Sequence, residues 1–246
     1  MRLDNYLVKE KGIKSRSWAK KLIQEHKILI NNVPAKKAGT IVLDNDDVKI
    51  LEDFKFVSRG GYKLEKALDL FNVNTNDRVC LDVGSSTGGF TDCLLQNGAR
   101  HVFGLDVGSG QMDSKLRNDP RVTCLENVNA RMLDDLIRTK LLKPFSTHPD
   151  LVVADLSFIS LTLVLKAVVN SVASNAEFIV LVKPQFELGK EALNKKGIVT
   201  DNRVRIKALE KIQSFCKENG WQVKGSDQSP IKGGDGNVEY LLYFKS

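Results

Sequence analysis

The sequence lacks two features of exported or membrane-inserted proteins. No apolar run is long enough to cross a bilayer, and no apolar signal-peptide core follows Met1. We therefore expect a cytoplasmic protein. Cysteine is also scarce, since Cys80, Cys93, Cys124 and Cys216 stand singly among apolar neighbours. Because no metal-type spacing links them, we expect buried free thiols and no metal site.

The net charge of +7 is confined to one end of the chain. Residues 1–37 contain ten basic and three acidic residues, whereas the rest of the chain contains 27 of each. With 246 residues, 42% of them hydrophobic and 27% charged, the chain can hold a small domain and a larger one. A basic N-terminal head on a neutral body predicts a polyanion-binding module joined to a second domain.

Residues 1–51 have the pattern of a small unit of helices and strands. Leu3 and Leu7 share one face of a first short helix, and Ser15 can cap a second helix. Residues 28–30 and 47–51 read as strands. The basic residues favour contacts with the backbone of folded RNA, and a solvated basic surface is the alternative. The candidate RNA-binding residues are Arg2, Lys14, Arg16, Lys20, Lys21, Lys27 and Arg59.

Several short motifs of this region resemble the S-four RNA-binding domain, which recurs in RNA-modifying enzymes. They are Arg2-Leu3-Asp4, Ser15-Arg16-Ser17, Leu22-Ile23-Gln24-Glu25, Ile28-Leu29-Ile30-Asn31 and Asp46-Asp47-Val48. The resemblance implies an RNA-binding domain over residues 1–55. The segment Ser58-Arg59-Gly60-Gly61 then reads as a hinge, so we expect a linker at 56–61 and a second domain over 62–246.

Strands and helices alternate in the second domain, which predicts a parallel sheet with helices on both faces. We expect a helix over 62–71 and strands near 78–83, 101–106, 121–125, 150–155 and 177–183. A helix near 202–219 and two strands around a glycine-rich turn at 233–236 end the chain and add one antiparallel strand. This order predicts an α/β protein with a Rossmann-like, seven-stranded methyltransferase sheet, preceded by the small α+β domain.

The first of these strands runs into an acidic residue and a glycine loop, Asp82-Val83-Gly84-Ser85-Ser86-Thr87-Gly88-Gly89. Glycines let the backbone approach a ligand closely, and the helix that follows offers free N–H groups. A nucleoside-bearing ligand fits this arrangement, with Asp106 after the second strand to accept hydrogen bonds from ribose hydroxyls. Ser86 occupies a position where the dinucleotide fingerprint needs glycine, which disfavours a dehydrogenase. Turn-only glycines and a helix-capping Asp82 are the alternatives.

Four charged residues from distant segments are expected at one edge of the sheet. Asp155 and Lys183 end parallel strands, and Glu239 begins the final antiparallel strand. Lys63 lies at the start of the helix that precedes the sheet. Ligands bind at this edge in doubly wound sheets, so the four side chains are expected to share a cleft. A lysine there can act as a general base or hold an attacking hydroxyl, while the acids orient it. Each residue taken alone is more often a solvated loop residue.

Motifs spread over the second domain resemble the TlyA family, whose members were named hemolysins and are similar to FtsJ-type ribosomal RNA 2′-O-methyltransferases. The motifs are the glycine loop extended to Phe90-Thr91, Asp106-Val-Gly-Ser-Gly-Gln111, Asn129-Ala-Arg131, Asp155-Leu-Ser-Phe158, Val182-Lys-Pro-Gln-Phe-Glu187 and Lys196-Gly-Ile-Val199. The resemblance implies S-adenosylmethionine as methyl donor and a ribose hydroxyl of ribosomal RNA, typically of a cytidine, as acceptor. It implies a catalytic tetrad of Lys63, Asp155, Lys183 and Glu239. The donor-binding residues are then Asp82, Gly84, Ser85, Ser86, Gly88, Gly89, Phe90, Asp106 and Asn129.

Two missing motifs narrow the methylated atom. No Asn-Pro-Pro-aromatic sequence follows the fourth strand, where enzymes that methylate exocyclic amines carry it. No Pro-Cys pair supplies the nucleophile that base-carbon methylation needs. A ribose oxygen is therefore the favoured acceptor. Two other classes stay open: a non-catalytic ribosome-associated factor with a retained methyl-donor pocket and, least favoured, a membrane-lysing hemolysin.

Overall fold

The chain divides into two compact units, Met1–Lys55 and Phe56–Ser246. The structure is a computed structural model that describes residues 1–13, 15–24, 27–51, 55–143 and 145–246. These described residues form one hydrophobic cluster in the first unit and two in the second. Each unit therefore has the apolar interior that a separate domain needs.

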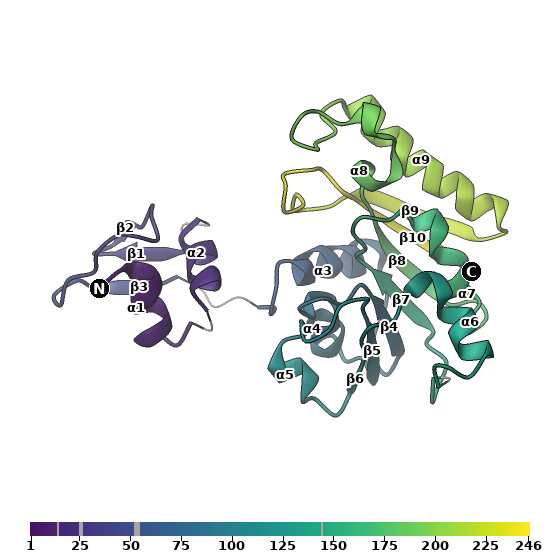
Figure 1. Cartoon of the computed structure of the whole chain (residues 1–246), viewed down its shortest axis with the longest axis horizontal. Helices are drawn as coiled ribbons and strands as arrows, with labels where there is room; N and C mark the ends of the chain where they lie inside the picture. The colour runs from purple at the N-terminus through teal and green to yellow at the C-terminus, as the bar shows by residue number, and fades with distance from the viewer. Residues whose placement is uncertain (14, 25–26, 52–54, 144) are drawn as a thin grey trace. The chain divides into compact units, whose positions relative to one another are not determined.

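The first unit packs two helices against a small antiparallel sheet (Figure 1). Helices α1 (Leu3–Lys9) and α2 (Arg16–Gln24) precede strands β1 (Ile28–Ile30), β2 (Val33–Pro34) and β3 (Val48–Ile50), and the strand order is β2-β1-β3. Ser15 Oγ accepts a hydrogen bond from the Trp18 backbone N at 3.2 Å, which confirms the predicted cap. Asn31 and Asn32 join β1 to β2 with φ angles of 51° and 64°, as a tight two-residue hairpin requires.

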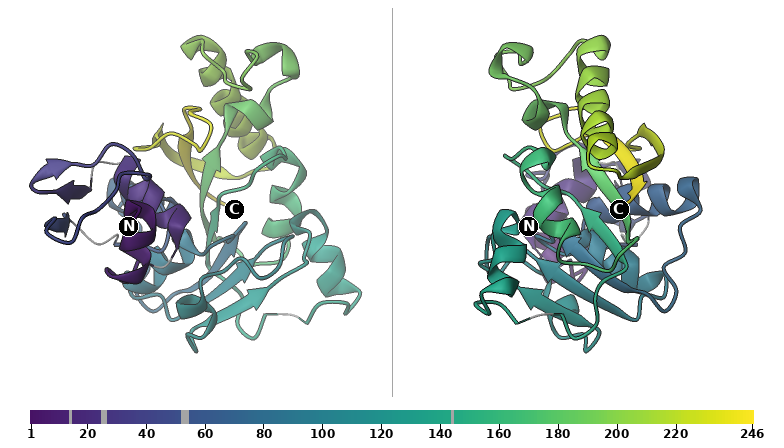
Figure 2. Two further views of the ribbon diagram at one scale, coloured as in Figure 1. Left: turned by 60° about the vertical axis from the view of Figure 1, so that its left-hand side comes forward. Right: turned by 90° about the vertical axis from the view of Figure 1, so that its right-hand side faces the viewer.

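The described residues of the second unit form a seven-stranded sheet (Figures 1 and 2). Its strands are β4 (Val79–Val83), β5 (His101–Leu105), β6 (Val122–Leu125), β7 (Leu151–Ala154), β8 (Glu177–Val182), β9 (Gln222–Gln228) and β10 (Tyr240–Lys245). The order is β6-β5-β4-β7-β8-β10-β9, and β10 runs antiparallel to both of its neighbours. The predicted mostly parallel sheet with a terminal hairpin is confirmed.

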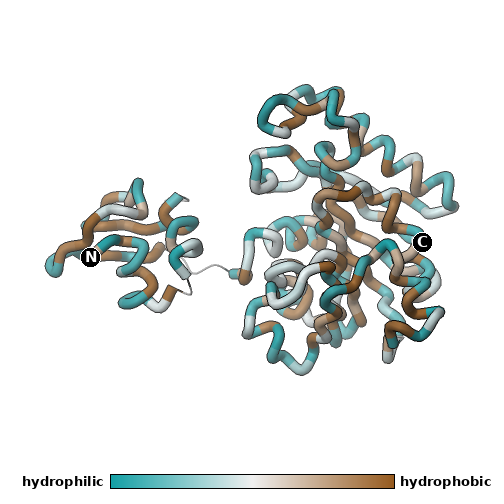
Figure 3. Tube along the Cα trace, in the orientation of Figure 1, coloured by the Kyte–Doolittle hydropathy of each residue, from teal (hydrophilic) through white to brown (hydrophobic). Residues whose placement is uncertain are grey.

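Helices cover both faces of this sheet (Figure 2). Helices α3 (Gly60–Phe71), α4 (Gly89–Gln96) and α5 (Ser114–Arg117) pack on one face, and α6 (Leu133–Arg138), α7 (Leu165–Val169) and α9 (Asn202–Glu218) on the other. Short helices lie in the loops: η1 (Ala130–Met132), η2 (Leu161–Leu163), α8 (Pro184–Glu187) and η3 (Lys190–Ala192). The central strands are predominantly hydrophobic (Figure 3) because their side chains alternate between two core layers.

Residues 56–61, predicted to be a linker, belong to the second unit instead. Phe56 is buried in its core, and Val57 N donates a hydrogen bond to Asp92 Oδ2 at 2.8 Å. Helix α3 begins at Gly60, and a Cβ at Gly61 would lie 2.3 Å from Phe56 Cγ. The prediction was wrong here because glycine at position 61 serves close packing of a helix on Phe56, not a hinge.

The four cysteines are free thiols, as predicted. Burial raises the pKa of Cys80 and Cys216 to about 12, which leaves both thiols unreactive at neutral pH. Over the described residues, no helix is long and apolar enough to cross a membrane. Nor does the described part of the chain bring together three or more His, Cys, Asp or Glu side chains as a metal site.

Candidate functional site

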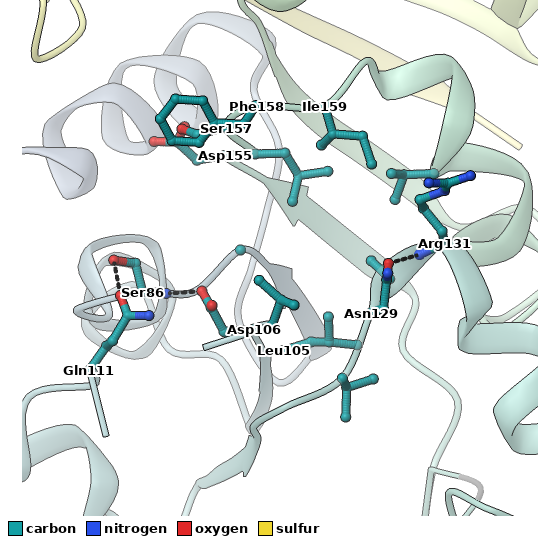
Figure 4. A pocket seen from close by; sticks show the side chains of 16 residues that line it. Ser86, Leu105, Asp106, Gln111, Asn129, Arg131, Asp155, Ser157, Phe158 and Ile159 are labelled. Atoms are coloured by element: carbon teal, nitrogen blue, oxygen red, sulfur yellow. Dashed lines mark hydrogen bonds between the residues drawn. The ribbon is translucent and has the colours of Figure 1, made fainter. Parts of the chain in front are cut away.

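A cavity of about 540 Å³ opens beyond the carboxyl ends of the parallel strands (Figure 4). Its lining comes from the ends of four neighbouring strands and the loops that follow them: Gly84 and Ser86 after β4, Leu105 at the end of β5 with Asp106, Val107 and Gln111 after it, Val128–Arg131 after β6, and Asp155–Ile159 with Val164 after β7. This volume is within the range of small-molecule sites, and the edge is the one where doubly wound sheets bind ligands.

Gly84 lets the loop after β4 pass directly beside the loop after β7. Its φ angle is +83°, and a Cβ at this position would lie 2.8 Å from the backbone oxygen of Asp155. Gly84 N donates a hydrogen bond to Leu105 O at 2.8 Å, which places the loop against β5 as well. Only glycine combines this backbone conformation with this close approach.

The carboxylate of Asp106 lines the cavity and is held by two backbone amides, and Figure 4 draws the bond from one of them, Ser86 N. Ser86 N donates to Asp106 Oδ2 and Gly108 N donates to Oδ1, both at 2.8 Å. Each carboxylate oxygen has lone pairs beyond the one that these amides use. Asp106 can therefore accept hydrogen bonds from a ligand hydroxyl in a fixed orientation.

Asp82 does not line the cavity, although it was predicted to bind the donor. The strand alternation turns its side chain toward α4, where it is fully buried. Asp82 Oδ2 accepts hydrogen bonds from Thr91 N at 2.9 Å and from Thr91 Oγ1 at 2.6 Å. Burial raises the pKa of Asp82 to about 7, although the two Thr91 hydrogen bonds act in the opposite direction. The structure thus favours the alternative interpretation, in which Asp82 anchors the start of a helix.

Four other predicted donor-binding residues of the extended glycine loop are buried and do not line the cavity: Ser85, Gly88, Gly89 and Phe90. Gly88 is the N-cap of α4 and has a left-handed backbone conformation, and Phe90 packs into the core under α3 and α4. These residues therefore form the buried side of the loop. Asn129 does line the cavity, and its side-chain oxygen accepts a hydrogen bond from Arg131 N at 3.1 Å.

The structure brings together the four charged residues predicted to share a cleft. Lys63 Nζ lies 2.6 Å from Glu239 Oε2 and 3.6 Å from Asp155 Oδ2, and Lys183 Nζ lies 2.6 Å from Asp155 Oδ1. Lys63, Lys183 and Glu239 are almost fully buried, whereas the Asp155 side chain is 21% exposed and lines the cavity. We call these four residues the charged tetrad. Its charges alternate in space, acid, lysine, acid, lysine, and sum to zero.

The alternation of side chains between the two faces of the sheet explains why these residues meet. Val182 of β8, Ala154 of β7 and Tyr240 of β10 point to the core under α6, α7 and α9. Their neighbours Lys183, Asp155 and Glu239 therefore point to the other face, which α3 covers. Lys63 lies in the first turn of α3, at the same edge of the sheet. Sequence position and strand alternation together assemble the charged tetrad.

Two residues after β7 received no role from the sequence. Ser157 Oγ accepts a hydrogen bond from Lys183 Nζ at 2.9 Å, and so helps to orient that ammonium group. Phe158 is 89% exposed at the cavity, with a φ angle of +65° that a bulky residue rarely adopts (Figure 4). Its ring lies 5.1 Å from the ring of Phe186, which follows Lys183. The only sequence signal for Phe158 was its place in the motif Asp155-Leu-Ser-Phe158, three residues after the strand-end acid.

In the first unit, two predicted RNA-binding arginines share one buried acid. Arg2 Nε lies 3.1 Å from Asp4 Oδ1, and Arg16 Nη2 lies 2.9 Å from Asp4 Oδ2. Hydrogen bonds from Arg2 and then Arg16 hold the pKa of Asp4 well below its usual range. Both arginine side chains stay about half exposed, at 47% and 56%. They therefore combine a structural ion pair with a surface that can still meet a phosphate.

The other predicted RNA-binding residues differ in their surroundings. Lys20 is exposed on α2, and Lys21 Nζ lies 4.6 Å from the centre of the Trp18 ring. Lys27 is half-buried before β1. Arg59 belongs to the second unit, directly before α3, because residues 56–61 pack there. Lys14 lies outside the described residues.

Comparisons with known proteins agree with this division of the chain. An FtsJ-like methyltransferase model matches residues 56–246, and an S4 domain model matches residues 1–48. The 16S/23S rRNA (cytidine-2′-O)-methyltransferase TlyA of Mycobacterium tuberculosis is 42% identical over 100% of this chain and 90% of its own. Hemolysin A of Brachyspira hyodysenteriae is 39% identical over 99% of both chains. A Streptococcus thermophilus structure described as a hemolysin candidate is 38% identical, with a TM-score of 0.77 over 100% of this chain and 88% of that one.

Proposed function

The chain belongs to the TlyA family of FtsJ-like methyltransferases, and on that premise we propose that it transfers a methyl group from S-adenosylmethionine to the 2′-hydroxyl of a cytidine ribose in ribosomal RNA. The observation that carries the proposal is the charged tetrad, assembled from four distant segments beside the cavity. The first unit docks the RNA, and the reaction takes place in the cytoplasm, where ribosomal RNA is found.

The cavity fits the proposed donor. Asp106 offers fixed carboxylate oxygens to ribose hydroxyls, and Gly84 leaves room beside the backbone. Val107, Val128 and Ile159 add the apolar surface that an adenine ring needs. When bound, S-adenosylmethionine supplies an electrophilic methyl group on a sulfonium sulfur.

The charged tetrad then acts on the ribose hydroxyl. Asp155 is its most exposed member and the one that lines the cavity, so the hydroxyl reaches the tetrad there. The Lys183 ammonium next to it lowers the free energy of the negative charge that develops on the ribose oxygen as its proton passes by way of Asp155 to solvent. Lys63 and Glu239 fix Asp155 from the other side. Much of the acceleration comes from this fixed alignment of oxygen and methyl group.

Exposed lysines near the charged tetrad support RNA as the substrate. Lys196 and Lys232 lie on two loops that Asn237 joins, since Asn237 Oδ1 accepts from Val199 N and its Nδ2 donates to Gly197 O, both at 3.1 Å. Glu239 of the tetrad follows two residues after Asn237. Ammonium groups in such loops can contact the phosphates that flank the reacting ribose.

Replacing Asp106 should weaken donor binding. We expect Asp106→Ala to raise the Kd for S-adenosylhomocysteine by about 10- to 100-fold, since hydrogen bonds to a charged group contribute about 1.5–3 kcal/mol. Isothermal titration calorimetry on the full chain measures this change. Asp227→Ala, at an exposed acid on edge strand β9, serves as the control. Equal Kd values for S-adenosylhomocysteine in Asp106→Ala and Asp227→Ala would show that the donor does not bind at Asp106.

Phe158 should contribute to RNA binding, because its exposed ring near the charged tetrad offers a surface on which a base can stack. We expect Phe158→Leu to raise the KM for RNA by about 10- to 100-fold, since base–aromatic stacking contributes about 1–3 kcal/mol. Phe158→Trp should keep the KM near the wild-type value because it keeps an aromatic face. Steady-state kinetics with varied RNA checks both variants. Equal KM values for Phe158→Leu and Phe158→Trp would exclude stacking.

Methyl mapping tests the proposed function itself. Purified full chain is incubated with S-adenosylmethionine and either ribosomal subunits or naked ribosomal RNA, and 2′-O-methylated positions are mapped. RNA from cells with and without the gene is mapped in parallel. We expect a methyl group at a defined cytidine only where the protein is present. No transfer to either substrate would remove the proposal.

A further inference from the structure

A buried carboxylate outside the charged tetrad connects the two chain segments that carry Asp155 and Lys183. Glu187 ends α8 and has a side chain only 1% exposed. Its Oε1 accepts a hydrogen bond from Leu161 N at 2.8 Å, and its Oε2 accepts one from the Ser160 hydroxyl. Lys211 on α9 donates to the backbone oxygen of Glu187 at 2.6 Å and lies 3.6 Å from its carboxylate. No step of the proposed reaction uses this group.

These contacts fix the far end of the loop that contains Asp155. The loop starts where Asp155 N donates to Val83 O at 3.1 Å, and it ends at Ser160 and Leu161, where η2 begins. Between these points lies Phe158, whose positive φ angle persists only where the surrounding structure imposes it. Glu187 supplies the constraint at the η2 end.

The same carboxylate fixes the segment that contains Lys183. Helix α8 is a single turn of four residues with Lys183 at its N-cap, and Glu187 N donates to Lys183 O at 3.2 Å. A helix this short is unstable by itself, so its position depends on contacts with the rest of the fold. Glu187 makes those contacts with the loop after β7 and with α9.

We propose that Glu187 is a positioning residue, which sets the distance between Lys183 and Asp155 by joining α8 to the loop after β7. The proposal rests on the proposed function, because its consequence is a methyl-transfer rate. Without the carboxylate, the Leu161 amide and the Ser160 hydroxyl lose their buried partner, and the two segments are free to separate. The hydrogen bonds that hold Asp106 and Asn129 in the cavity lining come from Ser86, Gly108 and Arg131 and do not pass through Glu187.

Three variants of the full chain test the proposal, with kcat and donor affinity measured separately. We expect Glu187→Ala to lower kcat by about 10- to 100-fold, because misplacement by about 1 Å costs that much, and to change the Kd for S-adenosylhomocysteine by less than about threefold. Glu187→Gln keeps an acceptor for Leu161 N and a group that can bond to Ser160. It should therefore retain most of kcat.

Glu177→Ala provides the matched control. Glu177 lies at the other end of β8, where it is partly buried and contacts Arg78, Tyr243 and Lys245. Its loss should destabilise the fold but leave kcat per folded molecule within about twofold of wild type, since its contacts lie away from the aligned groups. Hydrogen exchange at Leu161 should rise in Glu187→Ala and stay protected in Glu187→Gln and Glu177→Ala.

The outcomes separate the two proposals. Full kcat in Glu187→Ala, equal losses in Glu187→Ala and Glu187→Gln, or an equal loss in Glu177→Ala would overturn the positioning role. A wild-type chain that methylates no RNA would overturn the proposed function instead. In that case hydrogen exchange at Leu161 still decides whether Glu187 joins the two segments.

Discussion

Lys183→Met should reduce methyl transfer by about 10²- to 10⁴-fold at saturating donor and RNA, the range that a proton-transfer or charge-stabilising group contributes. Methionine fills a similar volume but removes the ammonium group that lies 2.6 Å from Asp155 Oδ1. Lys183→Arg should fail as well, because a planar guanidinium does not reproduce a compact ammonium group between Asp155 and Ser157. Single-turnover assays with purified enzyme measure the loss.

Two controls make the result on Lys183 specific. The Kd for S-adenosylhomocysteine should stay within about threefold of wild type, since the residues that line the cavity are unchanged. Lys224→Ala, at an exposed lysine on β9, should transfer methyl groups at the wild-type rate. Full methyl transfer by Lys183→Met would contradict the role assigned to the Lys183 ammonium group in the reaction.

Asp82→Asn should remove a large pH dependence of stability. The folded pKa of Asp82 is about 7 because the group is buried, whereas an unfolded aspartate titrates near pH 4. Between these values the folded chain holds a proton that the unfolded chain has released, so the free energy of unfolding falls as pH rises through this window. The fall amounts to about 4 kcal/mol in full, and to about 3 kcal/mol between pH 5 and pH 8.

The asparagine variant keeps an acceptor for Thr91 but carries no charge. We expect the contribution of position 82 to the free energy of unfolding to be nearly constant between pH 5 and pH 8 in this variant. At pH 8 the free energy of unfolding of Asp82→Asn should exceed that of wild type by about 1–3 kcal/mol. The asparagine avoids the burial of a charge, but its own buried N–H groups offset part of this stabilisation. Urea unfolding in a Trp18→Phe background, in which Trp221 is the remaining tryptophan, reports on the second unit alone. Asp69→Asn on the surface of α3 serves as control, and an unchanged slope in Asp82→Asn would contradict the assignment.

The sequence was sufficient for the sheet and for the charged tetrad because both follow from periodicity. Buried strands are nearly continuous apolar runs, so the start and end of β4, β7 and β8 were predicted to within a residue or two. Asp155 and Lys183 each directly follow such a run. Their position on the same face as Glu239 follows from the two-residue repeat of strands.

The sequence was insufficient where side chains pair across long separations. Asp82 and Thr91 are nine residues apart, and nothing in the spacing shows that the acid points beneath the loop and not into the cavity. From the sequence alone, Arg2 and Arg16 resemble arginines available to bind phosphate. The structure shows that both are paired with the buried Asp4. Glu187 ends a motif that the sequence shows, but the motif does not reveal its role, since its partners Leu161 and Lys211 lie on other segments.

Backbone conformation was the other limit. The sequence shows Phe158 only as part of a motif. Its positive φ angle and its exposure could not be predicted, because both depend on how the two ends of the loop are fixed. Gly60 and Gly61 were interpreted as a hinge because glycine permits either a flexible joint or a close contact. The packing of Phe56 against Gly61 shows that these glycines serve a close contact.

The alternating acids and lysines of the tetrad leave the reaction centre with no net charge. If the proposed function holds, the groups that attract RNA phosphates are therefore the other basic groups of the protein, above all those of the first unit. Ionic strength should consequently govern how tightly the RNA associates, while the rate of transfer within the bound complex changes little.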